Sequence, residues 1–186
     1  RLEGSDWRVL VDGFNDHSSV VGSLDGEIYL LTDINAPKYR LVSVNSSQDI
    51  SDSELWKDII PQSDNLLESA ELSAGRLFAT FLRKACNVVV SYDFNGSDSK
   101  EISLPSKVGS VGGFSGKMNA SEIFYAFTSF THPASIYKYD PVLNKSVLYS
   151  APNVRFNPEE YVTNQVEYSS KDGTVVPMFI VHRKGL

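Results

Sequence analysis

EIYLLT at residues 27–32, RLFATF at 76–81 and EIFYAF at 122–127 are three versions of one apolar stretch. They begin at positions 27, 76 and 122, so they lie 49 and 46 residues apart. Each combines β-branched or aromatic residues over a length typical of a strand, and helical periodicity is nearly absent along the chain. The sequence therefore predicts an all-β protein built from a repeat.

Three further sets of strands recur with these stretches. A second set follows them closely, as YRLVSV at 39–44, VVVSY at 88–92 and IYKYD at 136–140. We expect a preceding strand at 18–24, 67–72 and 110–114, and a following strand at 55–60, 100–104 and 146–149. Four short strands in a unit of this length are typical of a β-propeller blade.

A blade of this kind needs neighbouring blades to stack against it. One four-stranded blade cannot bury both of its faces, whereas neighbouring blades bury them against each other. The alternative is a β-sandwich in which the spacing is a coincidence. The dipeptides Asp25-Gly26, Ala74-Gly75 and Asn95-Gly96 lie at junctions where tight turns are expected, and residues 7–11 look like the last strand of a preceding blade.

The repeat stops after Ala151-Pro152. Residues 155–160 read as a polar linker that contains Pro158. A hairpin pattern follows, with strands at 161–169 and 174–181 around a turn at 171–173. We therefore divide the chain into a propeller segment at 1–154, a linker at 155–160 and the start of a different domain at 161–186.

This hairpin region resembles a known family. The stretch YSSKDGTVVPMFIVH at 168–182 is similar to the segment of prolyl oligopeptidases that leads from the propeller into the α/β-hydrolase domain. Three further stretches resemble the late blades of the same family, namely NAPKYRL at 35–41, VGSVGGFSG at 108–116 and EIFYAFTSF at 122–130. The likeness follows the chain in order over nearly its whole length.

The resemblance implies a fold and an activity. It implies about three blades of a seven-bladed β-propeller, followed by a β-hairpin that belongs to an α/β-hydrolase domain. Members of the family are cytosolic serine endopeptidases that cut short peptides after proline, and the propeller restricts access to a Ser-Asp-His triad on the hydrolase domain. Some relatives join peptide ends instead, because an amine and water compete for the same acyl-enzyme.

No family site residue can be matched to a position in this chain. We therefore assign it no catalytic, cofactor-binding or metal-ligating residue and expect no cofactor. Ser110 and Ser115 lack one of the two glycines that a nucleophile elbow needs, and we interpret both as turn or strand residues. The three histidines show no metal-binding spacing, and Asp12, Asp25, Asp33 and Asp140 are expected to cap turns.

Composition narrows the possible partners. The net charge is −6 and no cluster of lysine and arginine offsets it, which argues against nucleic acid and anionic lipid as partners. Apolar runs are too short to span a bilayer, so we expect no membrane association. The single cysteine, Cys86, fits a reducing compartment such as the cytoplasm, and we interpret it as a packed thiol. The four Asn-X-Ser sequons are interpreted as turns.

Two function classes follow. In the first, the chain is the non-catalytic wall of a peptidase, with short proline-containing peptides as substrates and with the earlier blades and the hydrolase domain as its partners. In the second, it is a stand-alone binding module. Three blades would leave two open sheet faces, so the first class is favoured.

Overall fold

The first repeat forms a four-stranded antiparallel sheet. A computed structural model describes residues 7–186. Its first sheet contains β1 (Ser18–Leu24), β2 (Glu27–Thr32), β3 (Arg40–Asn45) and β4 (Lys57–Ile60), and each strand pairs with the next in the chain. Sequential antiparallel pairing of four short strands is the arrangement of a propeller blade.

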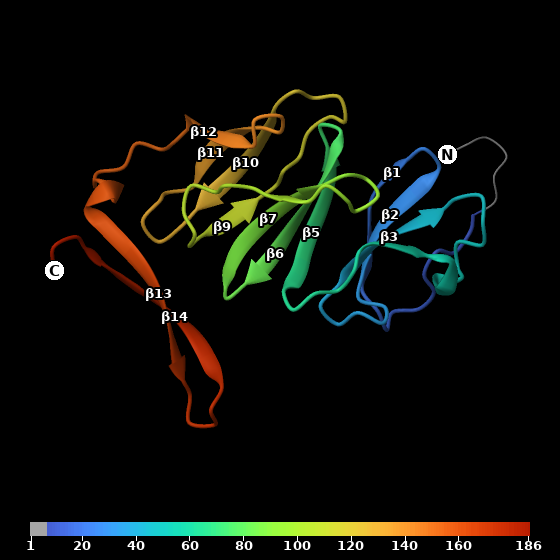
Figure 1. Cartoon of the computed structure of the whole chain (residues 1–186), viewed down its shortest axis with the longest axis horizontal. Coiled ribbons are helices and arrows are strands. Elements are labelled where there is room, and N and C mark those ends of the chain that lie inside the picture. The colour runs from blue at the N-terminus through green and yellow to red at the C-terminus, as the bar shows by residue number, and fades with distance from the viewer. Residues whose placement is uncertain (1–6) are drawn as a thin grey trace.

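The second and third repeats form two more sheets of the same topology. The second sheet contains β5 (Leu66–Ser73), β6 (Arg76–Arg83), β7 (Cys86–Tyr92) and β8 (Lys100–Glu101). The third contains β9 (Ser110–Gly112), β10 (Ile123–Thr128), β11 (Ser135–Asp140) and β12 (Lys145–Ser150). The three sheets follow one another side by side (Figure 1), which confirms the predicted stack of three four-stranded blades.

Tight turns connect the first two strands in two of the blades. Asp25 and Gly26 have φ angles of 50° and 84°, and Ala74 and Gly75 have φ angles of 45° and 70°. Two successive residues with positive φ match the twist of antiparallel strands. Gly96, between β7 and β8, also has a positive φ of 86°. All three predicted turns are confirmed.

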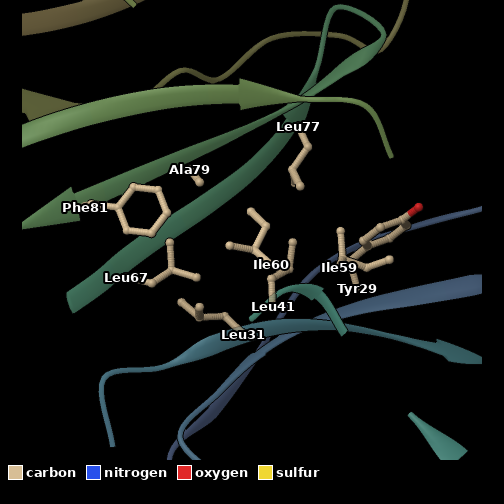
Figure 2. Close-up of a cluster of buried hydrophobic side chains, with 9 residues drawn as sticks. All are labelled: Tyr29, Leu31, Leu41, Ile59, Ile60, Leu67, Leu77, Ala79 and Phe81. Carbon is tan, nitrogen blue, oxygen red and sulfur yellow. The ribbon is translucent and has the colours of Figure 1, made fainter. Parts of the chain in front are cut away.

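The blades are held together by apolar cores between their faces. Figure 2 shows the core between the first and second blades, where Leu31, Leu41 and Ile60 point toward side chains of the second blade that include Leu77 and Phe81. These five side chains are at least 93% buried. Each sheet therefore contributes one face to a core that neither could form alone.

The core between the second and third blades is aromatic. Phe114 is 1% exposed and lies between Phe78 and Tyr125, with ring centroids 5.2 and 4.5 Å away and nearly parallel planes. Tyr139 meets Phe114 edge-on at 5.9 Å. Offset and edge-on aromatic pairs stabilise a core beyond the area that they bury.

The prediction of a strand at residues 7–11 is wrong. This segment pairs with none of the described strands, and the Trp7 side chain is 97% exposed. A strand needs a hydrogen-bonded neighbour, and the sheet that would supply one is not among residues 7–186. Instead, Leu10 and Val11 pack on the outer side of the first blade with Trp56.

Two following strands are shorter than predicted. The strand predicted at 55–60 begins at Lys57, because the Asp52 side chain accepts from Glu54 N–H and caps a 3-10 turn at Ser53–Leu55. The strand predicted at 100–104 ends at Glu101. Beyond it, Ile102 still donates its N–H to Val89 at 2.8 Å before Pro105 interrupts the chain.

The chain leaves the third blade and forms a separate hairpin. A 3-10 turn at Pro158–Glu160, capped by Asn157, precedes β13 (Tyr161–Ser169) and β14 (Val175–Arg183), which pair along their whole length. The predicted hairpin is confirmed, with its second strand shifted by one to two residues. Figure 1 shows the hairpin projecting from the row of blades. Helix in the described region is limited to 3-10 turns, and none is long and apolar enough to cross a membrane.

Candidate functional site

Two loops of the propeller meet the hairpin at one edge of the blades. The first is the β6–β7 turn of the second blade, and the other is the β10–β11 loop of the third blade. Both follow the second strand of their repeat, so stacking of the blades places them on the same edge. We define the contact face as the five residues that touch across this junction, namely Lys84, Phe130, Gln165, Glu167 and Phe179.

The β6–β7 turn holds the hairpin through Lys84. Lys84 and Ala85 have φ angles of 51° and 62°, so the two residues make a tight turn that exposes the Lys84 backbone. The Gln165 side-chain amide donates to the Lys84 carbonyl oxygen. The Lys84 ammonium lies 2.7 Å from the Glu167 carboxylate. One propeller residue thus binds two residues of β13, through its backbone and through its charge.

The β10–β11 loop adds an aromatic contact. The Ser129 hydroxyl accepts from the N–H groups of Thr131 and His132, at 3.3 and 3.1 Å. This local bonding closes a tight loop whose Phe130 side chain is 62% exposed. The Phe130 ring lies 5.2 Å from the ring of Phe179 on β14, with the planes tilted by 45°.

One face of the hairpin makes all of these contacts. Gln165 and Phe179 are cross-strand partners in the β13–β14 ladder, and Glu167 lies two residues beyond Gln165. Side chains that alternate by two, or that lie opposite each other, share a face of a two-stranded sheet. The hairpin therefore docks on the propeller with its Gln165–Glu167–Phe179 face.

A cavity of about 630 Å³ adjoins the contact face. The residues that line it include Lys84 and Gln165 of the contact face, together with Asn87, Ile102 and Ser106. The lining mixes charged, polar and apolar groups, and the Arg83–Glu101 ion pair, at 3.4 Å, belongs to it. Such a surface suits polar contacts with another part of a protein or with a peptide.

The wall of the cavity contains the thiol of Cys86. Cys86 lines it but is 5% exposed, and its lining residues include no histidine. A thiol needs an adjacent base or a cationic environment to act as a nucleophile. The interpretation of Cys86 as a packed thiol is confirmed by this burial.

The serines considered as nucleophiles and the histidines considered as metal ligands lie in separate parts of the fold. Ser110 begins β9 and Ser115 lies in the loop after it, and neither precedes an α-helix. His17, His132 and His182 belong to different parts of the fold, and the described residues contain no group of three His, Cys, Asp or Glu side chains suited to a metal. The nucleophile-elbow geometry is thus missing at both serines.

Several polar residues shape turns as predicted. Asp140 accepts from the N–H groups of Val142 and Leu143 at 2.8 and 2.9 Å. The Asp33 side chain instead accepts from the N–H of His17, 16 residues earlier, at 2.7 Å, so the expectation that it caps a turn is wrong. In two of the sequons, Asn45 and Asn95 accept from the N–H two residues later. The bonds to Asp140, Asn45 and Asn95 are Asx-turns, which confirms the turn interpretation at these three positions.

The pKa values of Glu71 and Asp172 are shifted in opposite directions. Burial between the second and third blades raises the pKa of Glu71 above its ordinary value, and a bond from Phe114 N–H partly opposes the shift. In the β13–β14 turn, the Ser170 hydroxyl and Thr174 N–H donate to Asp172 and lower its pKa to about 2. The first carboxylate is destabilised by the fold and the second is stabilised by it.

The contact face was not predicted from the sequence. Its members are separated by 81 residues between Lys84 and Gln165, and by 49 residues between Phe130 and Phe179. Alternation along residues 161–169 could have placed Gln165 and Glu167 on one face of a strand. No local pattern could have indicated which loops that face would meet.

Comparisons with known proteins agree with this architecture. Residues 1–152 match the sequence profile of the prolyl oligopeptidase N-terminal beta-propeller domain. The chain is 37% identical to a prolyl endopeptidase of Elizabethkingia meningoseptica over 98% of its own length and 25% of the relative's length. A prolyl endopeptidase of Dictyostelium discoideum is 33% identical, over 94% of this chain and 24% of the relative. The chain thus spans about a quarter of the curated relatives that it matches.

A solved structure extends the similarity to three dimensions. It comes from a structural and mechanistic analysis of two prolyl endopeptidases, which concerned the role of inter-domain dynamics in catalysis and specificity. It is 36% identical, with a TM-score of 0.86, over 100% of this chain and 27% of the solved chain. Both the blades and the hairpin are therefore included in the likeness.

Proposed function

The chain belongs to the prolyl oligopeptidase family, and from this we propose that it forms the late blades of a seven-bladed propeller in a serine endopeptidase that hydrolyses short peptides after proline. The observation that carries the proposal is the order of the parts. Three stacked blades are followed by a docked hairpin, and 98% of the chain aligns with a prolyl endopeptidase.

In this proposal the chain restricts access to the active site and has no catalytic residue of its own. Residues 1–154 are the propeller segment, 155–160 the linker and 161–186 the start of the α/β-hydrolase domain. The Ser-Asp-His triad is supplied by the rest of the polypeptide, as are the earlier blades. Support comes from the cavity beside the contact face, which pairs no nucleophile with a histidine. A cytoplasmic location is part of the proposal, supported by the single, buried cysteine.

A second candidate is peptide macrocyclisation. A dual function macrocyclase-peptidase of Amanita bisporigera is 29% identical over 96% of this chain. In such a reaction, the amine of the peptide's own N-terminus would attack the acyl-enzyme in place of water, so the same ester bond breaks and a cyclic amide forms. Hydrolysis is favoured because the prolyl endopeptidases are the more similar relatives.

The test compares residues 1–186 with the full-length protein from the same source. The substrates are an internally quenched peptide with one proline and a matched peptide in which alanine replaces that proline. We expect cleavage after proline only in the full-length protein, blocked by a serine-directed inhibitor. Cleavage by residues 1–186 alone, or no cleavage by either protein, would overturn the proposal. Product masses from a longer proline-containing peptide distinguish a linear from a cyclic product.

A further inference from the structure

The β7–β8 turn of the second blade contains the only Asn-Gly dipeptide in the sequence, Asn95-Gly96. β7 runs from Cys86 to Tyr92 and crosses the blade, so this turn lies at the opposite edge from the β6–β7 turn that meets the hairpin. The Asn95 side chain is exposed. The turn is therefore separate from the contact face and open to solvent.

Hydrogen bonds within the turn fix its conformation. Gly96 N–H donates to the Asp93 carbonyl oxygen at 3.0 Å, and Asp93 N–H donates to the Ser97 carbonyl oxygen at 2.9 Å. Together with the positive φ of Gly96, this is a three-residue hairpin loop that ends in a glycine bulge. The Asn95 side-chain oxygen accepts from Ser97 N–H at 2.8 Å. The Gly96 N–H and the Asn95 amide thus both have partners inside the turn.

An asparagine that precedes glycine is able to lose its amide group without an enzyme. The Gly96 backbone nitrogen attacks Cγ of Asn95 and closes a five-membered succinimide, while the Cγ–Nδ2 bond breaks and ammonia leaves. Water then opens the ring to aspartate or to isoaspartate, in which the backbone is longer by one methylene group. Glycine favours ring closure because it has no side chain beside the attacking nitrogen and its backbone rotates freely.

The first blade restrains the turn against this reaction. The Tyr29 hydroxyl donates to the Phe94 carbonyl oxygen at 3.1 Å, and the two rings meet edge-on at 6.5 Å. Gly96 packs on the Ile59 carbonyl group of β4. We call these contacts of Phe94 and Gly96 with the first blade the seam. For ring closure, the Gly96 nitrogen must leave its bond to Asp93 and turn toward Cγ of Asn95, so the seam must open locally.

The same place gives water access to the turn. A cavity of about 440 Å³ lies beside it, and Asn95 lines this cavity together with Glu27 and Ser43 of the first blade. A polar cavity of this size holds water. The water that opens the succinimide is therefore available where the ring forms.

Either product would fit the seam less well than asparagine. Isoaspartate lengthens the backbone next to Gly96, at the point where it packs on Ile59. Aspartate and isoaspartate both add a carboxylate to a turn that already contains Asp93 and Asp98. Like charges at close range destabilise one another. Modification of Asn95 should thus weaken the contact between the first and second blades.

We propose that Asn95 is a site of spontaneous deamidation whose rate is controlled by the seam between the first and second blades. A closed seam keeps the Gly96 N–H on Asp93 and slows ring closure, and local opening permits it. Because the product weakens the same seam, a modified molecule opens more readily than an unmodified one. The chemistry needs only water and does not depend on the proposed peptidase function.

The experiment follows the full-length protein during storage in mildly alkaline buffer, because the deprotonated Gly96 nitrogen is the nucleophile. Trypsin releases residues 85–100, and the mass of this peptide rises when an amide becomes an acid. Fragmentation distinguishes conversion at Asn95 from conversion at Asn87. Asn87 is the internal control, because Val88 follows it and its side-chain oxygen accepts from Val111 N–H at 2.9 Å. A sample taken at the start corrects for conversion during digestion.

Tyr29→Phe tests control by the seam, because it removes the hydroxyl that holds Phe94 and keeps the ring. Losing one hydrogen bond shifts an equilibrium by about fivefold, so we expect Asn95 to convert about two- to fivefold faster in this variant than in the parent. Tyr125→Phe is the control, because it removes a buried tyrosine hydroxyl from the core between the second and third blades. The synthetic peptide 85–100 should convert faster than all three proteins.

The unfolding midpoint in guanidinium chloride measures the consequence of the modification. Stored parent protein should unfold at a lower denaturant concentration than fresh parent. Stored Asn95→Ser should match its fresh sample, because serine keeps a side-chain acceptor for Ser97 N–H and forms no succinimide.

Three outcomes would overturn parts of the proposal. Conversion at Asn95 no greater than at Asn87, in both the parent and Tyr29→Phe, would overturn the site. Equal rates in the parent and the free peptide, or the same acceleration in Tyr125→Phe as in Tyr29→Phe, would overturn control by the seam. An unchanged midpoint in parent protein that has converted at Asn95 would overturn the weakening of the blade contact.

Discussion

Gly96 in the second blade lies directly against the backbone of Ile59 in the first. A Cβ atom added to Gly96 would stand 2.0 Å from the Ile59 carbonyl oxygen, and Gly96 has a φ of +86°. The contact lies between the β7–β8 turn and β4, so the turn of one blade packs on the outermost strand of its neighbour. Both the backbone conformation and the close approach require glycine here.

Gly96→Ala should therefore destabilise the full-length protein strongly. Left-handed backbone at alanine costs about 1–2 kcal/mol, and the clash with backbone adds roughly 1–3 kcal/mol. Gly75→Ala is the matched control, because Gly75 also has a positive φ of +70° but a Cβ there would meet nothing closer than 4.0 Å. The measurement is the unfolding midpoint in guanidinium chloride. Equal losses in the two variants would show that the interblade contact contributes nothing.

The aromatic core between the second and third blades should be equally sensitive. Phe114→Ala removes a ring that is 1% exposed and that lies between Phe78 and Tyr125. Replacing a buried phenylalanine with alanine leaves a cavity and lowers the free energy of unfolding by about 3–5 kcal/mol. Phe14→Ala is the control, because the Phe14 side chain is fully exposed and should change stability very little. Thermal unfolding of both variants tests the prediction, and a similar small shift in both would contradict it.

The blades were predictable because their signal is local and repeated. The strand Glu27–Thr32 has the bounds that the sequence predicts, because its apolar run begins directly after the turn residues Asp25-Gly26. Residues 7–11 carry the same apolar character but form no strand, because strand formation depends on a partner that this segment does not find. The contact of Lys84 with Gln165 and Glu167 depends on how the hairpin docks, and local propensity does not determine docking.

Glu71 should make stability depend on pH. Its pKa is raised above the ordinary value of 4.5 by burial, so the folded state favours the protonated carboxyl. That stabilisation is complete below the ordinary value and is lost as pH rises through the folded pKa. Glu71→Gln keeps an acceptor for Phe114 N–H without the charge. We expect the variant to be more stable than the parent at pH 7 and similar to it near pH 4, as measured by denaturant unfolding at both pH values.

The pKa of Asp172 is shifted downward, so its contribution to stability changes with pH in the opposite direction to that of Glu71. Its pKa of about 2 is below its ordinary value of 3.8, so its ionised form stabilises the fold above the ordinary value and loses this effect as pH falls toward 2. Asp172→Asn should thus be less stable than the parent at pH 7, with the difference shrinking below about pH 4. If both variants changed stability in the same direction at pH 7, the assignment of the two shifts would be wrong.

The outer face of the third blade should control whether residues 1–186 stay monomeric on their own. Phe124, Ile136 and Val147 lie on this face by strand register and are 38%, 39% and 45% exposed, with Tyr149 packed edge-on against Phe124 at 4.9 Å. The first blade differs, because Trp56, Leu10 and Val11 cover its outer side. An uncovered apolar sheet face of this kind promotes association.

We therefore expect the isolated chain to self-associate in sedimentation velocity, with a weight-average mass that rises with concentration. Ile136→Lys combined with Val147→Glu places opposite charges on the open face and should shift the chain toward monomer. Val9→Lys combined with Leu55→Glu is the control, because these exposed side chains lie away from that face. In the full-length protein the neighbouring blade would cover Ile136 and Val147, so the first pair should reduce its stability by several kcal/mol. A parent chain that stays monomeric and unfolds cooperatively would show that the three blades are a complete folding unit.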